Sequence, residues 1–297
     1  MKSTAAAVPD GPTCRDDDEY MARARLHQSR FRAAELGLSS YRAWGNRLTS
    51  DAALAGRNFY AWPGMLDAVD ARFGRGDKKL FWDMLASDHV PFNFFIPLRT
   101  LPHVSRALVA GWVGDVLSVD DIRMEWAPAP RRAFLDDRTS FDVYVAYTSK
   151  DGGKGGIGIE VKFTEGAYAW AKTERARMFD DGSLYNQTSR GSDLYVDGAT
   201  SALRTPRFKQ FWRNQLLGEA MRQRGDLRHF TSLLLHPSGN THFGEAAHDY
   251  TALLRPGARS SFVAMTFETF IQQCGCLDAS PAVTSWLRYL ERRYIVA

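Results

Sequence analysis

The chain has 297 residues, of which 44% are hydrophobic and 24% charged, and its formal net charge is +4. A chain of this size and composition can bury a sizeable core, which excludes wholesale disorder and low-complexity fibres. Three cysteines are too few for a disulfide framework. No apolar run approaches the roughly 18 to 20 residues of a membrane helix, and the N-terminus lacks the apolar region of a signal peptide. We expect a soluble, cytoplasmic protein without a membrane partner.

The N-terminal part of the sequence predicts helices. Residues 1–18 are small, polar and acidic, which is typical of a mobile tail. The segment Glu19–Leu36 places apolar residues among charges at helical spacing and is followed by Gly37. Short helices and loops should follow, so we expect a helical extension over residues 19–84. Residues 80–85 and 91–117 are richly apolar, which favours buried helices that are interrupted by prolines.

Strands are predicted from residue 122 onward. The segments 122–126, 141–148 and 156–164 alternate apolar and polar residues, and the glycine-rich turn at 149–155 should join the last two into a hairpin. No internal repeat or flexible linker divides the chain. Residues 85–297 should therefore form one mixed α/β core, with further elements at 205–224 (helix), 230–235 and 261–266 (strands), 267–273 and 281–294 (helices).

Three polar side chains share one face of the predicted hairpin. Asp142, Glu160 and Lys162 are all even-numbered, and side chains alternate along a strand with a period of two. If the loop is centred near Gly152, Asp142 lies opposite Lys162. The other face should point to a core and carries the apolar residues Phe141, Val143, Ile159, Val161 and Phe163.

Converging carboxylates indicate a specific chemistry. Two carboxylates repel each other unless a proton or a cation lies between them, and oxygen ligands suit Mg²⁺ or Mn²⁺. A bound divalent ion lowers the pKa of its water and polarises a phosphoryl oxygen. A neighbouring lysine can offset charge, orient that water or stabilise the phosphate. Hydrolysis of a phosphodiester is therefore one hypothesis; the other is a solvated strand face with a surface ion pair of little energetic value.

The arrangement of these residues resembles a known family. Asp142 opens one strand, and after 17 residues Glu160-Val161-Lys162 ends the next. This pattern resembles the PD-(D/E)xK nuclease superfamily and, within it, a bacterial group of restriction-endonuclease-like proteins. The resemblance covers about residues 85 to 270 and is strongest at 91–98, 140–143, 159–165 and 214–217. It implies a restriction-endonuclease-like core, a central mixed β-sheet flanked by helices, to which the N-terminal helices are an extension.

The resemblance also implies roles for individual residues. Asp142 and Glu160 would bind Mg²⁺ or Mn²⁺ together with the Val161 carbonyl, and Lys162 would be the catalytic lysine. Gln215 would match a polar residue that some members of the superfamily project from the following helix. Many members add another carboxylate from a preceding element, and Asp88 and Glu125 are the two candidates for that third ligand.

The expected function is therefore a Mg²⁺-dependent nuclease that hydrolyses DNA, with RNA as an alternative substrate. The Arg-rich stretches 204–228 and 19–47 would hold the phosphate backbone, although solvated helix faces are an equal interpretation of them. A homodimer would suit double-strand cutting. The alternative function is a catalytically inactive nuclease-fold module that binds nucleic acid or protein. The target sequence, endo- or exonuclease mode and pathway (restriction, repair or phage defence) stay open.

Overall fold

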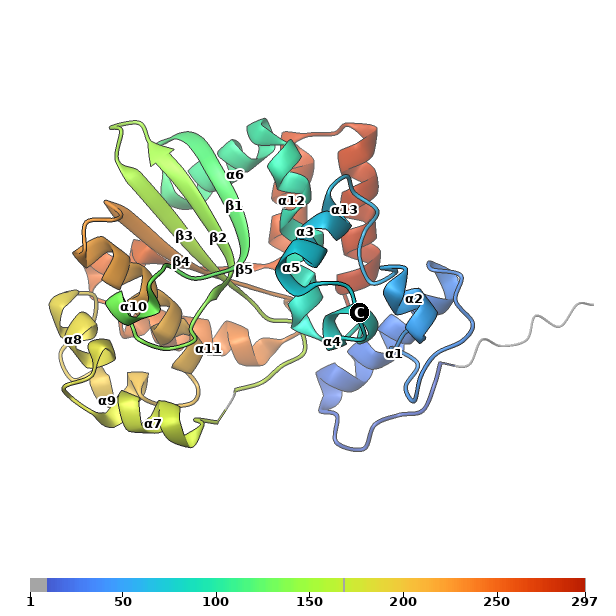
Figure 1. Ribbon diagram of the computed structural model, residues 1–297, viewed down its shortest axis with the longest axis horizontal. Coiled ribbons are helices and arrows are strands. Elements are labelled where there is room, and N and C mark those ends of the chain that lie inside the picture. Colours follow the sequence, from blue (N-terminus) through green and yellow to red (C-terminus); the bar gives the residue numbers. More distant parts are fainter. Residues whose placement is uncertain (1–9, 168, 297) are drawn as a thin grey trace, which may run out of the picture.

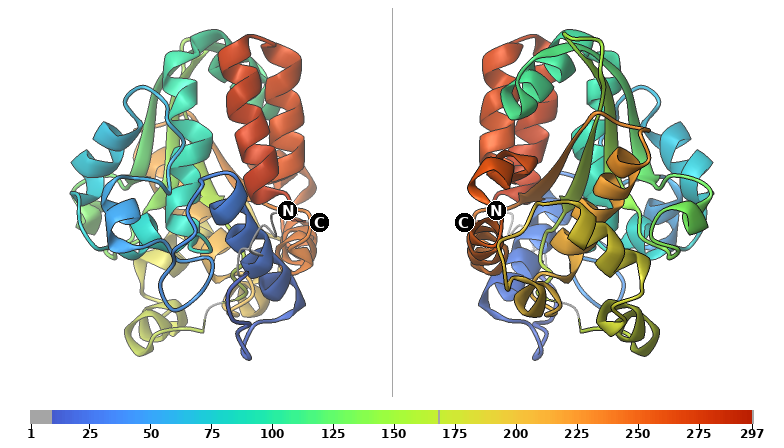
Figure 2. Two further views of the ribbon diagram at one scale, coloured as in Figure 1. Left: turned by 90° about the vertical axis from the view of Figure 1, so that its right-hand side faces the viewer. Right: turned by 90° about the vertical axis from the view of Figure 1, so that its left-hand side faces the viewer.

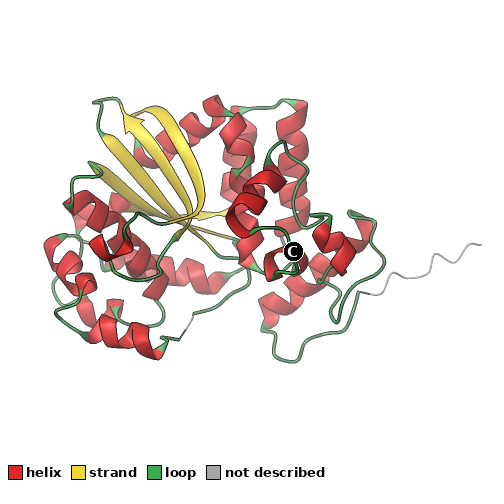
Figure 3. Cartoon of the chain, viewed as in Figure 1, coloured by secondary structure: helices red, strands yellow, loops and turns green. Residues whose placement is uncertain are grey.

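The computed structural model describes residues 10–167 and 169–296. Its centre is a five-stranded sheet in the order β1-β2-β3-β4-β5, and the strands are β1 Val116–Trp126, β2 Phe141–Ser149, β3 Lys154–Val161, β4 His229–His236 and β5 Phe262–Thr266. The first three strands pair antiparallel, whereas β4 and β5 join in parallel. Helices cover both faces of this mixed sheet (Figures 1 and 3), which confirms the predicted α/β class.

Helices make up most of the rest of the described chain. None of those in the described ranges combines the length and the apolar character needed to cross a bilayer. The α-helices are α1 Glu19–Ala34, α2 Ser50–Leu54, α3 Met65–Phe73, α4 Lys79–Trp82, α5 Val90–Phe95, α6 Pro102–Val113, α7 Lys172–Phe179, α8 Leu184–Gly191, α9 Thr200–Leu203, α10 Lys209–Gln223, α11 Thr241–Ala252, α12 Phe267–Leu277 and α13 Pro281–Tyr294. The short 3₁₀ helices are η1 Ser87–His89, η2 Pro97–Thr100, η3 Arg131–Ala133 and η4 Pro256–Ser261.

Two apolar cores lie on opposite faces of the sheet. One packs the odd-numbered residues Val143, Val145, Ile159 and Val161 against helices that include α5, α6, α12 and α13. The other packs Tyr144 and its neighbours against α8, α10 and α11. Along β3 the odd-numbered residues Ile157, Ile159 and Val161 all lie in the first core, so parity indicates the side of the sheet on which Glu160 lies.

The β2–β3 register differs from the prediction by two residues. The Cα partners run from Thr148↔Lys154 to Val143↔Ile159, and continuing this register sets Asp142 opposite Glu160, not opposite Lys162. The prediction was wrong because the turn is centred one residue earlier; the Ser149 amide donates to the Gly153 carbonyl at 2.9 Å. A shift of two preserves parity, so Asp142 and Glu160 still share one face.

Phe141 lies on the opposite face from the one the sequence suggested. Its ring belongs to the core beside α10, where it stacks with Tyr144 at 5.7 Å between centroids. Gly158 makes this possible, because a Cβ at that position would lie 2.3 Å from Phe141 Cε1. The other four residues of the predicted apolar face, Val143, Ile159, Val161 and Phe163, lie together in the opposite core.

The N-terminal helices pack on the C-terminal end of the chain. Figure 2 shows α12 and α13 side by side with α1 near their base. Arg293 of α13 is fully buried and donates to the Asn58 carbonyl at 2.8 Å. Of the predicted mobile tail, residues 1–9 lie outside the described residues; in the rest of it, Asp17 forms an ion pair of 2.5 Å with Arg25 of α1. The extension and the sheet therefore share one packed structure.

Candidate active site

Asp142 and Glu160 line the same small polar pocket. Asp142 is the second residue of β2, and Glu160 is the last but one of β3. Because these two strands are antiparallel neighbours, the start of one and the end of the other meet at the same edge of the sheet. The pocket has a volume of about 190 Å³ and is lined by Arg138, Thr139, Ser140, Asp142, Glu160, Gln210, Arg213 and Asn214.

The carboxylate of Glu160 is held by two donors. Lys162 Nζ lies 2.5 Å from Oε1, and Asn214 Nδ2 donates to Oε2, also at 2.5 Å. Glu160 and Lys162 are only 6% and 4% exposed. A buried ion pair repays the loss of hydration only when further hydrogen bonds satisfy its remaining atoms. Lys162 and Asn214 together therefore orient Glu160 and offset part of its negative charge.

Asp142 carries a less compensated negative charge. Burial, and next the charge of Glu160, raise the pKa of Asp142 well above its ordinary value; Lys162 and the hydrogen bond from the Val161 amide oppose this. That amide donates to Asp142 Oδ2 at 2.7 Å. Burial disfavours the Lys162 ammonium, but the carboxylates of Glu160 and Asp142 outweigh it and raise the lysine pKa. The site thus holds a charged lysine and an acidic pair whose repulsion a proton or a cation would relieve.

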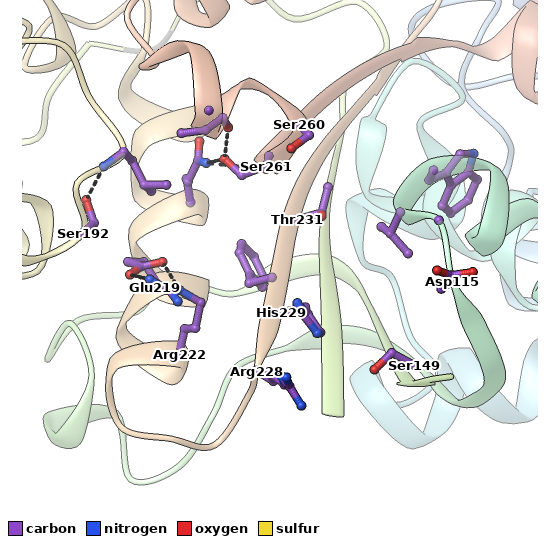
Figure 4. A pocket seen from close by; sticks show the side chains of 18 of the residues that line it. Asp115, Ser149, Ser192, Glu219, Arg222, Arg228, His229, Thr231, Ser260 and Ser261 are labelled. Atoms are coloured by element: carbon purple, nitrogen blue, oxygen red, sulfur yellow. Dashed lines mark hydrogen bonds and ion pairs between the residues drawn. The ribbon is translucent and has the colours of Figure 1, made fainter. Parts of the chain in front are cut away.

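Gln215 does not join this site. Its Nε2 donates to Ser261 Oγ at 2.6 Å, and its Oε1 accepts from the Tyr250 hydroxyl at 2.9 Å. Gln215 lines a larger pocket of about 1240 Å³ (Figure 4), which also includes Ser149 at the far end of β2 and His229 at the start of β4. The predicted role of Gln215 therefore has no support in the geometry, because one residue along a helix turns a side chain by about 100°.

Asn214 is the residue of α10 that donates to the Glu160 carboxylate, and sequence reasoning missed it. Gln210 and Asn214 are four residues apart, so they lie on one face of the helix, and both line the small pocket. This i, i+4 pair of amides was the available signal. Gln215 lies one residue beyond that face, in the core that includes Leu216.

Arg213 ties the segment before Asp142 to two helices. Its guanidinium donates to Thr139 Oγ1 at 2.7 Å and forms ion pairs with Asp137 at 3.1 Å and Glu174 at 2.7 Å. Lys209, one turn away on α10, binds the other oxygen of Glu174 at 2.5 Å. Because Thr139 lies three residues before Asp142, this network fixes how the chain enters β2.

Asp88 and Glu125 lie near the charged cluster without completing a metal site. Burial, and next Asp88, raise the pKa of Glu125 to about 7, with a smaller effect of Glu160. Desolvation and then Glu165 raise the pKa of Asp88, although its side chain reaches solvent. Within residues 10–167 and 169–296, no group of three or more His, Cys, Asp or Glu side chains is arranged to hold a metal ion. The two carboxylates that share the small pocket are Asp142 and Glu160.

The comparisons with known proteins agree with this geometry. A model of the PD-(D/E)XK nuclease superfamily matches residues 15–296, nearly the whole chain. No curated protein and no solved structure gave a match. The chain therefore belongs to the PD-(D/E)XK nuclease superfamily, and its mixed sheet with flanking helices is the restriction-endonuclease-like fold.

Proposed function

We propose that this member of the superfamily is a Mg²⁺-dependent nuclease that hydrolyses phosphodiester bonds of DNA. One observation carries the proposal: Asp142 and Glu160 line a single polar pocket, and Lys162 forms a buried ion pair with Glu160. A carboxylate pair with a charged lysine beside it is suited to phosphodiester hydrolysis with a hard cation. Membership of the superfamily supports the proposal only through the fold, which is that of nucleases.

The donor set fits a hard divalent cation. Asp142 and Glu160 offer only oxygen atoms, and the mutual repulsion that raises the Asp142 pKa would be relieved by a positive charge between them. We expect the Val161 carbonyl to be a third oxygen ligand, with water and the substrate phosphate as the others. When bound, Mg²⁺ would lower the pKa of a water molecule and polarise the scissile phosphate.

The residues of the chain would supply positioning and charge. Asn214 holds one oxygen of Glu160, which leaves the orientation of that carboxylate fixed before substrate arrives. Lys162 remains an ammonium at neutral pH, so it can stabilise the negative charge that develops on the phosphate and orient the attacking water. Arg213 keeps the segment that leads to Asp142 in place.

The test is cleavage of labelled duplex and single-stranded DNA by the purified protein in Mg²⁺, Mn²⁺ and EDTA. We expect cutting that EDTA abolishes and that falls by at least about a hundredfold in Glu160→Ala and Lys162→Ala. Glu245→Ala and Lys154→Ala are matched controls, since both change exposed residues of the same charge outside the pocket. Unchanged cutting by Lys162→Ala would overturn the proposed mechanism. Labelled RNA in parallel decides between the two nucleic acids.

A second candidate function is a nuclease-fold module that binds nucleic acid or protein without cutting. Two observations favour it. Both Glu160 oxygens already bind protein groups, Lys162 and Asn214, and the described part of the chain offers no third carboxylate for a metal ion. The same experiment separates the two functions. Nucleic-acid binding that Glu160→Ala leaves unchanged, together with no cleavage in either metal, would favour the module.

A further inference from the structure

The basic stretch 204–228 is neutralised by the protein itself. All seven of its lysines and arginines lie within 4 Å of a carboxylate, so little free positive charge remains for a polyanion. The pairs are Arg204–Asp181, Arg207–Asp249, Lys209–Glu174, Arg213–Asp137, Arg222–Glu219, Arg224–Asp226 and Arg228–Asp151. In the N-terminal stretch four of the six arginines are paired in the same way, Arg25–Asp17, Arg30–Asp10, Arg42–Asp77 and Arg47–Asp83, whereas Arg32 is buried and Arg23 is exposed without a carboxylate partner among the described residues.

Two other segments carry exposed cations whose charge is not offset in this way. We call residues 131–138 and 172–177 the basic arms. Within the described residues, six of their side chains are solvent exposed and form no ion pair with a carboxylate: Arg131, Arg132, Arg138, Lys172, Arg175 and Arg177. The first arm follows β1 and leads to Asp142, and the second comes ten residues after Lys162.

The basic arms lie together beside the candidate active site. Arg177 of the second arm donates to the Asp136 carbonyl of the first at 2.5 Å. Arg213 joins them again, since it binds Asp137 of the first arm and Glu174 of the second. Arg138 lines the pocket that contains Asp142 and Glu160.

The acidic residues of the arms weaken this surface little. Asp137 and Glu174 are paired with Arg213, and Glu174 also with Lys209. Asp136 is the exposed acid that remains in the arms. Two residues after the second arm, Phe179 is 49% exposed, and the Arg175 guanidinium lies 5.1 Å from its ring centroid. The arms and this neighbouring ring thus combine six cations that have no carboxylate partner in the described chain with one accessible aromatic side chain, a composition that suits a phosphate backbone and an unpaired base.

We propose that the basic arms, rather than α10 or α1, form the surface that holds the nucleic-acid backbone next to the scissile phosphate. This inference rests on the proposed function and assigns its substrate-binding surface. Phosphates on either side of the cleaved bond would contact the arms, and Arg138 would contact the one nearest the carboxylates. Phosphate contacts of this kind set the position and the affinity of the nucleic acid but do not distinguish base sequences.

The experiment compares two triple variants that remove the same charge. The arm variant Arg132→Gln/Lys172→Gln/Arg175→Gln changes three residues that form no ion pair with any carboxylate that the structure describes. The control Arg222→Gln/Arg224→Gln/Arg228→Gln changes three residues of the 204–228 stretch that do form ion pairs. Binding of a fluorescent 20-base-pair DNA is measured by anisotropy in EDTA over a range of salt concentrations. Circular dichroism confirms that both variants are folded.

We expect the arm variant to lose at least about tenfold in affinity and to reduce the slope of log K against log salt by about 2 to 3. The control should change affinity by less than about threefold. Equal losses in both variants, or a loss in the control alone, would overturn the proposal for the arms while leaving a DNA-binding nuclease intact. A wild-type protein that neither binds nor cuts nucleic acid would instead overturn the proposed function, since the comparison of variants presupposes binding.

Discussion

Lys162 and Glu160 form a buried ion pair, with 2.5 Å between Nζ and Oε1, at the end of β3. The two residues are separated by one residue whose side chain points into the opposite core, so they lie on the same face of the sheet. Asp142 faces them from the neighbouring strand and adds a second negative charge. Both carboxylates therefore depend on Lys162 for compensation of their charge, and the buried lysine depends on them.

Removal of the lysine charge should destabilise the protein in the absence of metal. Lys162→Met leaves the Glu160 carboxylate buried beside Asp142 without its cation, and breaking a buried pair in this way costs about 3 to 5 kcal/mol. The double variant Glu160→Gln/Lys162→Met removes both charges, so its free energy of unfolding should fall clearly less than that of Lys162→Met. Urea unfolding in EDTA measures both free energies. Equal losses in the single and double variants would contradict the coupling, because the glutamate charge would then be tolerated without the lysine.

Asn214 and Gln215 should respond differently to removal of their amides. Asn214→Ala frees Glu160 Oε2, and loss of a group that orients a ligand typically lowers activity or metal affinity by about 10- to 100-fold. Gln215→Ala removes the buried hydrogen bonds to the Tyr250 hydroxyl and Ser261 Oγ, so it should lower the free energy of unfolding by about 1 to 3 kcal/mol and change the cleavage rate little. Cleavage rates and urea unfolding of both variants provide the comparison. A larger loss of cleavage rate in Gln215→Ala than in Asn214→Ala would show that Gln215, and not Asn214, acts in the candidate active site.

The strand alternation explains why the carboxylate pair could be found from sequence. Apolar residues at 157, 159, 161 and 163 force the even-numbered residues to the other face, and this holds for any register that preserves parity. A β-hairpin further brings the start of its first strand to the end of its second. The meeting of Asp142 and Glu160 therefore follows largely from local pattern, and an error of two residues in the register left it unchanged, although the same pattern placed the neighbouring Phe141 on the wrong face.

Tertiary contacts decide what the sequence pattern could not. The choice between Asn214 and Gln215 depends on the rotation of α10 against the sheet, and both residues are polar members of a helix with apolar neighbours on several sides. Whether the 204–228 cations form ion pairs depends on carboxylates that are distant in sequence, such as Asp137 for Arg213 and Asp249 for Arg207. A run of arginines indicates positive charge, but only the fold shows how much of it stays available to a ligand.

Glu125 should make the stability of the metal-free protein depend on pH. Burial and the nearby Asp88 raise its pKa from 4.5 to about 7 in the folded state. Between these two values the folded protein retains a proton that the unfolded chain has released, so the free energy of unfolding should fall as the pH rises through this window. Glu125→Gln removes the titration and should raise the free energy of unfolding at pH 8 by on the order of 1 to 2 kcal/mol, with no difference at pH 4.

Urea unfolding of the Glu125→Gln variant and the wild type in EDTA, at pH values from 4 to 8, measures this effect as the difference between two curves. Asp142 also has a raised pKa and contributes its own slope, but that slope is common to both proteins and cancels to first order in the difference. Glu245→Gln is the matched control, because that residue is exposed on α11. Curves for the wild type and Glu125→Gln that stay parallel from pH 4 to 8 would show that the Glu125 carboxyl has no raised pKa, and that burial and the nearby Asp88 do not make its titration affect stability.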